Sequence, residues 1–300
     1  NSPRPASQRA AALVLTAAML TTFTAPAFAG TWYIEDGDIT ISAGESGNNV
    51  TQNENTTKND TDTIITNREE GASSHTVTID AKDKDDKVEV TLKDVNIDTS
   101  KQSKAAVSVT GSGDTTIELD GDNELKSGDR HAGLEHNQTV DSEGNVTSGK
   151  LTIQDDNDNA GSLTATSGYF GAGIGGGSAK AGQVTITGGT ITAISGDGAG
   201  IGGGYTGDAS NIRIEGNADV IAFGNSGAAI GSGYQSRVNS DITITDHATV
   251  TAAGLDGCGI GGGLLHYGKD TVTISGNASV HAEALDSAAA IGSEQASATV

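Results

Sequence analysis

The chain has 300 residues with a formal net charge of −22, and 43 of its residues are glycine. The glycines do not recur at every third position, which excludes collagen. The 39 acidic residues against 17 basic ones leave no basic stripe for nucleic acid, and a single cysteine excludes a disulfide framework. With four Phe, five Tyr and one Trp, any core is built from Ile, Val, Leu and Ala in thin layers, which favours a solenoid.

Residues 1–29 have the features of a secretory signal peptide. Arg4 and Arg9 precede an apolar run over residues 10–20, and residues 27–29 (AFA) form a small-x-small cleavage sequence. The run is shorter than the roughly 20 residues that span a membrane, which argues against the alternative of a retained anchor. We therefore predict that the mature protein begins at Gly30 and is secreted, with no membrane insertion after cleavage.

Residues 30–73 are predicted to form an N-terminal cap and a polar linker. Residues 32–34 (WYI) and 39–41 (ITI) suggest a short strand pair that covers the open end of a stack of turns. Residues 42–62 are rich in Asn and Thr and almost free of apolar side chains, which is typical of a loop or loosely ordered linker.

A repeat occupies the rest of the chain, which we assign as one domain over residues 74–300. The string GAGIGGG and its variants recur with spacings of 27, 29, 30 and 31 residues between their isoleucines: Ile174, Ile201, Ile230, Ile260 and Ile291. Each repeat also holds two short runs of alternating apolar residues, such as residues 184–186 (VTI) and 191–193 (ITA). Degenerate copies extend back to Val90, so seven turns of three strands can be counted.

Stacked three-strand turns bury a continuous core that one turn alone cannot bury. Successive strands then run parallel, which predicts an all-β, right-handed parallel β-helix. A propeller would need four strands and about 40 residues in each blade. No six-residue register typical of left-handed β-helices is present.

The alignment of the repeats also predicts the structural roles of several individual residues. Cys258 occupies a slot that other turns fill with alanine, so we expect a small buried side chain rather than a reactive thiol. His247 aligns with Asn217, Asn277 and Asp122, residue types that tolerate a left-handed backbone at a corner. GAGIGGG lacks the GK[ST] ending of a phosphate loop and recurs once per turn, which indicates a corner.

The early turns resemble a known family. Residues 77–109 (VTIDAKDKDDKVEVTLKDVNIDTSKQSKAAVSV) and 115–128 (TTIELDGDNELKSG) are similar to the secreted carbohydrate-binding β-helix domain of clostridial and other gut bacteria. The resemblance covers roughly residues 76–300, and it lies mainly at core and corner positions. It implies a pectate-lyase-like fold, a polysaccharide ligand that is often acidic, and bound calcium.

The acidic residues suggest two functions, calcium binding and catalysis. Asp155, Asp156 and Asp158 stand in the densest carboxylate group, and alternating oxygen ligands suit calcium; the alternative is a solvated acidic turn. A β-helix lyase or hydrolase would need clustered acids beside a basic residue. Arg213, with Asp241 and Asp270 as candidate neighbours, is the nearest approach, so we expect no catalytic residues.

Tyr205 and Tyr234 each follow a repeat isoleucine by four residues, and Tyr267 lies nearby. Rungs about 4.8 Å apart would present these rings as a ladder on which sugar rings stack. The alternative is that the rings pack on one another and order a corner. Outward Thr-x-Thr pairs suggest an ice-binding face, but Arg213 and Glu215 interrupt it.

These observations predict a noncatalytic, secreted or cell-surface module that binds a polysaccharide or other glycan, with calcium as its only expected cofactor. We expect a monomeric module of a longer chain, attached to the cell surface through a further C-terminal region. The alternatives are a structural adhesin stalk or spacer and, less favoured, a polysaccharide lyase or hydrolase.

Overall fold

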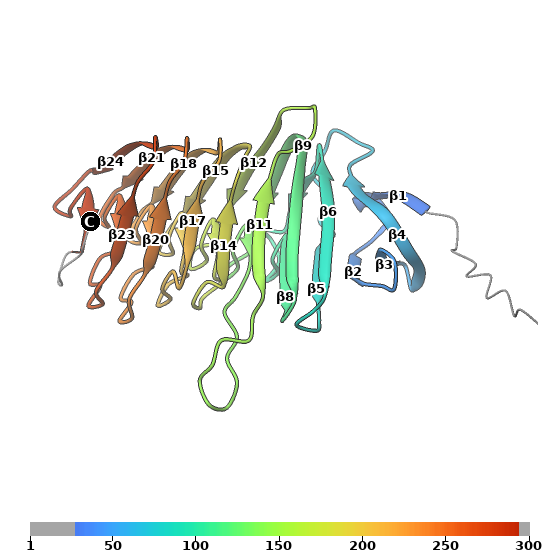
Figure 1. The fold of residues 1–300 in the computed structure, drawn as a ribbon, viewed down its shortest axis with the longest axis horizontal. Coiled ribbons are helices and arrows are strands. Elements are labelled where there is room, and N and C mark those ends of the chain that lie inside the picture. The colour runs from blue at the N-terminus through green and yellow to red at the C-terminus, as the bar shows by residue number, and fades with distance from the viewer. Residues whose placement is uncertain (1–27, 294–300) are drawn as a thin grey trace, which may run out of the picture.

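The protein is an all-β solenoid. The computed structural model describes residues 28–293, so residues 1–27 of the predicted signal peptide and residues 294–300 lie outside the described part. Within it the chain forms 25 strands and one short 3-10 helix, η1 (Ile34–Asp36). Figure 1 shows the strands side by side along the long axis, with the N-terminal strands at one end.

Each turn contributes strands to three faces, in which strands of successive turns pair in parallel. The first face contains β2 (Ile39–Ala43), β5 (Val77–Ala81), β8 (Val107–Gly111), β10 (Leu134–Glu135), β13 (Ile174–Gly175), β16 (Ile201–Gly202), β19 (Ile230–Gly231), β22 (Ile260–Gly261) and β25 (Ile291–Gly292). The second contains β1 (Phe28–Tyr33), β4 (Asn55–Thr66), β6 (Lys87–Lys93), the first half of β9 (Asp114–Lys126), β11 (Lys150–Gln154), β14 (Gln183–Ile186), β17 (Ile212–Ile214), β20 (Asp241–Ile244) and β23 (Thr271–Ile274). The third contains β7 (Asn96–Asp98), the second half of β9, β12 (Gly161–Thr166), β15 (Thr190–Ser195), β18 (Asp219–Gly224), β21 (Thr249–Gly254) and β24 (Ser279–Ala284).

The register between turns follows the sequence repeat. The five repeat isoleucines pair with one another in sequence order along the first face: Ile174, Ile201, Ile230, Ile260 and Ile291. On the second face Val184, Ile212, Ile242 and Val272 form a column that is at most 1% exposed. Because side chains alternate along a strand, this register places the buried apolar residues of the repeats beneath their equivalents in the next turn. The parallel β-helix prediction is confirmed.

The stack is longer than the predicted seven turns, at about nine. The sequence count starts at Val90, but β5 and β2 add further rungs before it. Ile39 of β2 pairs in parallel with Val77 of β5, although the two are separated by a long polar stretch. That stretch hides the repeat because its length and composition differ from those of later turns.

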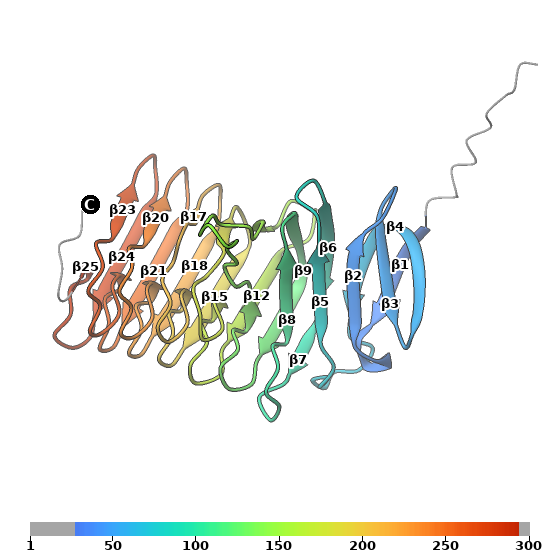
Figure 2. The ribbon, with the colours of Figure 1, turned by 90° about the horizontal axis from the view of Figure 1, so that it is seen from below.

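The prediction of a loop or linker over residues 42–62 is wrong. β3 (Asn48–Gln52) pairs antiparallel with both β2 and β4, so the stretch is a hairpin sheet at the end of the stack (Figure 2). Asn48 is buried, and its side-chain amide donates to Thr63 Oγ1 at 2.9 Å and to the Glu89 carbonyl at 2.7 Å. Polar side chains satisfied in this way form strands without apolar alternation.

Strands are present at the two predicted positions, although β1 ends at Tyr33 and Ile34 belongs to η1, and they do not pair with each other. β1 pairs with β4, whereas β2 pairs with β3 and β5. Together β1 to β4 form a cap over residues 28–66, which covers the N-terminal end of the solenoid (Figure 2).

Glycine is required inside the two-residue strands of the first face. Gly175, Gly202, Gly231 and Gly261 have φ values between 125° and 138°, which side chains of L-residues rarely adopt. A Cβ on each would also collide with the carbonyl oxygen of the equivalent glycine in the next turn. The GIGGG strings therefore let the backbones of successive turns approach closely along the first face. The strings were predicted to form corners only, but the Ile-Gly pair of each string is a short strand.

The corner assignment of His247 needs a shift of one residue. The left-handed residue is Asp246, with φ 59°, and its equivalents are Gly216 and Gly276 rather than Asn217 and Asn277. His247 follows the turn, and its Nε2 lies 3.2 Å from Asn277 Nδ2. Cys258 is fully buried, as predicted from its alanine slot.

Candidate functional site

Four aromatic residues form a continuous row along one edge of the solenoid, which we call the aromatic strip: Tyr169, Phe170, Tyr205 and Tyr234. Backbone pairing sets the position of the middle rings, because the Tyr205 amide donates to the Phe170 carbonyl at 2.8 Å. The ring centroids of successive members lie 4.9, 5.0 and 5.4 Å apart. The strip therefore crosses successive turns without a break.

The rings of the strip do not form the parallel ladder that the spacing suggests. Tyr169 and Phe170 meet at 89°, Phe170 and Tyr205 at 87°, and Tyr205 and Tyr234 at 50°. Edge-to-face packing of this kind orders the corner. Tyr205 and Tyr234 are half-buried, whereas Tyr169 is 60% exposed and offers the most open ring.

Sequence reasoning named Tyr205 and Tyr234 but missed Tyr169 and Phe170. Phe170 precedes the repeat isoleucine of its turn, whereas Tyr205 and Tyr234 follow theirs. An alignment on the isoleucines alone therefore places Phe170 in a different column. A search for aromatic residues near every corner would have found it.

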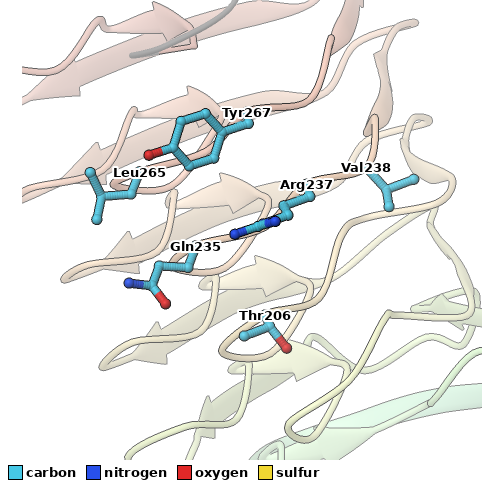
Figure 3. Close-up of a pocket in the computed structure, with 6 residues that line it drawn as sticks. All are labelled: Thr206, Gln235, Arg237, Val238, Leu265 and Tyr267. Atoms are coloured by element: carbon cyan, nitrogen blue, oxygen red, sulfur yellow. The ribbon is translucent and has the colours of Figure 1, made fainter.

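Tyr267, the third predicted tyrosine, lines a pocket of about 370 Å³ and forms no ring pair with the strip among residues 28–293. Three consecutive turns build this pocket, which Figure 3 shows with its side chains: Thr206, Gln235, Arg237, Val238, Leu265 and Tyr267. Tyr267 and Val238 are 54% and 45% exposed. The pocket therefore combines an open aromatic ring with hydroxyl, amide and guanidinium groups.

The pocket and the aromatic strip are joined at Gln235. Its side-chain amide donates to Tyr234 Oη at 3.1 Å, so one residue lines the pocket and contacts the last ring of the strip. Gln235 and Leu265 occupy equivalent positions in consecutive turns and have φ values of 58° and 57°. A left-handed backbone is uncommon for such residues and often accompanies functional sites.

Two arginines lie along this surface. Arg130 stacks over the Phe170 ring at 5.2 Å, and Arg237 lines the pocket. Neither takes part in a salt bridge within the described residues, whereas Arg68 pairs with Asp36 and Arg213 with Glu215. In a chain of net charge −22, guanidinium groups without a carboxylate partner are notable features of this edge.

A buried polar cluster lies in the chain segments that form the pocket. His266 Nε2 is 3.1 Å from Asp270 Oδ1, which also accepts the Ser240 amide at 2.9 Å, and both side chains are inaccessible to solvent. Asp208 accepts the Val238 amide at 3.1 Å, and its burial raises the pKa of its carboxyl group. These contacts fix the segments that carry Arg237 and Tyr267.

The three aspartates predicted to bind calcium do not converge. Asp155 Oδ2 accepts the Gly161 amide at 3.1 Å, whereas Asp156 and Asp158 are exposed. The loop is organised instead by Glu118, which accepts the backbone amides of Asp156 and Asn157 and both side-chain amides of Gln154 and Asn157. Residues 28–293 contain no group of three His, Cys, Asp or Glu side chains that could hold a metal ion.

The predicted neighbours of Arg213 are also not assembled. Arg213 contacts Glu215, two residues along its own segment, and stands between Thr185 and Thr243 of the adjacent turns. Asp270 is buried against His266 instead. Neither Asp241 nor Asp270 forms an ion pair with Arg213 among residues 28–293.

Comparison with known proteins supports the repeat architecture. A family model described as a β-helix repeat matches residues 159–178, 184–205 and 242–264, which include Phe170 and Tyr205. No curated protein and no solved structure matches significantly. The chain is thus a β-helix repeat protein. None of the described residues belongs to a helix long and apolar enough to cross a membrane.

Proposed function

We propose that this protein is a noncatalytic, secreted or cell-surface β-helix module that binds polysaccharide along the aromatic strip and the adjoining pocket. The observation that carries the proposal is their continuity: rings and pocket follow one another along the solenoid axis from Tyr169 to Tyr267. A linear surface of this kind matches a linear polymer better than a compact small molecule.

The chemistry of the surface supports a sugar ligand. Exposed tyrosine rings contact the C–H faces of sugars by dispersion and exclude water. Thr206, Gln235 and Arg237 supply the hydrogen-bonding groups that sugar hydroxyls require. Turns spaced by about 4.8 Å repeat on the scale of one sugar ring, so successive turns would contact successive units of a chain.

The two arginines favour a polysaccharide that carries carboxylate groups. Arg130 and Arg237 lie on the surface without a carboxylate partner in the described chain, and guanidinium groups bind carboxylates with two parallel hydrogen bonds. Salt screens the attraction between these arginines and carboxylates, so we expect contacts that depend on them to weaken as salt rises. The rest of the protein is strongly acidic and repels an acidic polymer, so we expect calcium, which neutralises both partners, to help binding.

A passive stalk or spacer is the second candidate. About nine stacked turns share one continuous core of Ile, Val, Leu and Ala, which makes an extended body able to hold another domain away from a surface. In this case the aromatic strip would serve only to order a corner.

A glycan array tests the two candidates together with catalysis. We expect binding to acidic polysaccharides such as polygalacturonate or alginate, and no rise in absorbance from unsaturated products in a lyase assay on the same polymers. Arg237→Gln should weaken binding, whereas Arg213→Gln on another face is the matched control and should not. Absence of any array signal would favour the stalk, and unsaturated products would overturn the noncatalytic assignment.

A further inference from the structure

A buried carboxylate in the cap faces the predicted cleavage site. Asp60 of β4 is 1% exposed and accepts three N–H groups: the Gly30 amide at 2.8 Å, the Trp32 indole at 2.8 Å and the Asp62 amide at 3.3 Å. No Lys, Arg or His pairs with it among the salt bridges of residues 28–293. Buried carboxylates are normally paired with a positive charge, and Asp60 has no such partner in the described residues.

Glycine is the residue that allows this contact. A Cβ at position 30 would lie 2.6 Å from Trp32 Nε1 and 2.7 Å from Asp60 Oδ2, closer than real Cβ atoms approach. A side chain here would have to displace the Trp32 indole and the Asp60 carboxylate from their present positions. Gly30 is also the residue that follows the small-x-small sequence at residues 27–29.

Phe28 and Ala29, the two described residues before Gly30, each form one pair with β4. Phe28 is 46% exposed, and the pairing of β1 with β4 shifts register between Phe28 and Ala29. From Ala29 onward the pairing is regular, with Ala29 opposite Asp62, Gly30 opposite Thr63 and Tyr33 opposite Thr66. Cleavage after Ala29 would therefore remove one regular pair, Ala29–Asp62, and leave the ladder from Gly30 to Tyr33.

We propose that cleavage of the Ala29–Gly30 bond creates an N-terminal ammonium group that forms a buried ion pair with Asp60 and locks the cap. Hydrolysis breaks the C–N bond: water supplies OH to the Ala29 carbonyl carbon and H to the Gly30 nitrogen, which takes a further proton from solvent. An existing amide hydrogen bond then becomes a charge-assisted one. The inference rests on the predicted signal peptide and goes beyond polysaccharide binding.

The surroundings of Asp60 contain three other charged groups. Asp62 of β4 and Lys87 and Glu89 of β6 line, with Asp60, a cavity of about 260 Å³. All three are exposed, unlike Asp60. A free α-amino group titrates at about 7.7–8.0, and a buried carboxylate beside it favours its charged form.

Trp32 is the only tryptophan of the chain, and its indole donates to Asp60, so its fluorescence reports on this site alone. The first measurement is the N-terminal mass of the protein secreted from a bacterial host expressing the full 300-residue chain. The second is a fluorescence titration from pH 6 to 10 on protein with a free Gly30 amine and on the same protein acetylated at Gly30.

We expect the secreted protein to begin at Gly30. Its fluorescence should show a transition with a midpoint above 8 that is absent from the acetylated protein. Asp60→Asn should move the midpoint to about 8 or below, the ordinary range of an α-amino group, whereas Asp62→Asn should keep it above 8. The melting temperature of the free-amine form should exceed that of the acetylated form by a few degrees at pH 7. A different first residue, or identical titrations of the free and acetylated forms, would overturn the proposal.

Discussion

Residues 28–160 and residues 161–293 form one three-faced solenoid, but the two regions differ in charge, strand length and glycine content. The first region holds 28 of the acidic residues from position 30 onward and long strands such as β9, and its charges pair at the surface, as in Lys93–Asp120 at 2.7 Å. The second region has four basic residues, short strands and glycines at most of its corners. The register between successive turns can therefore be held either by long strand pairs or by close approach of the backbones.

The two regions also treat charge differently. Arg68–Asp36 and Lys126–Asp98 in the first region are solvent-exposed, whereas His266 and Asp270 in the second are fully buried. The aromatic strip and the pocket lie almost entirely in the second region, where regular turns place side chains of adjacent rungs in line. The ordered region therefore presents the candidate binding surface, and the N-terminal region contributes the cap.

The largest expected effect comes from a glycine of the second region at which the backbones of successive turns approach closely, compared with a glycine of the first region that has open space around it. Gly231→Ala places a Cβ against the Gly261 carbonyl at φ 137°, and should lower the free energy of unfolding by about 3 kcal/mol or more. Gly71→Ala in the first region meets open space and should change it by less than about 0.5 kcal/mol. Urea denaturation measures both. Equal effects would show that close backbone approach is not what holds the second region together.

The buried pair should matter more than a surface pair. Asp270→Ala leaves His266 and the Ser240 amide without their acceptor, and we expect a loss of about 3 kcal/mol, since removing one partner leaves buried polar groups unpaired. Lys93→Met breaks a part-exposed pair and should cost at most about 1 kcal/mol. If thermal denaturation ranks the two variants the other way, the contrast in charge burial is wrong.

The failures of sequence reasoning follow the same division. The repeat isoleucines predicted the strands of the second region because each apolar position recurs beneath its equivalent. The antiparallel strands of the cap were missed because Asn48 and its neighbours satisfy their polar groups within the sheet and show no apolar period. Of the pocket residues, only Tyr267 was predicted. Arg237 and Gln235 were missed because they lie beside the other lining residues only when turns about 30 residues apart in sequence are stacked.

Acid should weaken the two regions unequally. Hydrogen bonds from Arg68 lower the pKa of Asp36, those from Ser100 lower the pKa of Asp98, and burial lowers the pKa of His136. Each of these groups stabilises the fold above its unfolded pKa, and that stability is lost as pH falls, from about 6.5 for His136 and about 4 for the aspartates. The first region should therefore open first in acid.

The pKa of Asp208, in the second region, is shifted in the opposite direction, so its contribution to stability changes with pH in the opposite sense. Its pKa is raised by burial, so its contribution is fully present below about pH 4 and is lost as pH rises through the folded-state value. Hydrogen exchange resolved by region at pH 7, 5 and 4 measures the difference, and Asp208→Asn should flatten the response of the second region only. Equal hydrogen exchange in the two regions at each pH would contradict the prediction that the first region opens first in acid.

Divalent cations give the smallest expected effect. If Asp155, Asp156 and Asp158 bind calcium after their loop rearranges, millimolar calcium should raise the melting temperature more than magnesium does, because magnesium demands stricter octahedral geometry. Asp155→Asn should remove the excess. Equal shifts from the two ions would indicate general screening of a strongly acidic chain and would end the calcium-site prediction.

The most direct test of polysaccharide binding is one double variant measured in two ways. Tyr205→Ala/Tyr234→Ala removes two rings of the aromatic strip, and calorimetric titration with an acidic polysaccharide should show a loss of about 1–3 kcal/mol in binding free energy. Because both rings are half-buried, we expect only a small fall in the melting temperature of the same sample. A large fall in melting temperature with unchanged affinity would show that the rings only order the corner, and would contradict the proposed function.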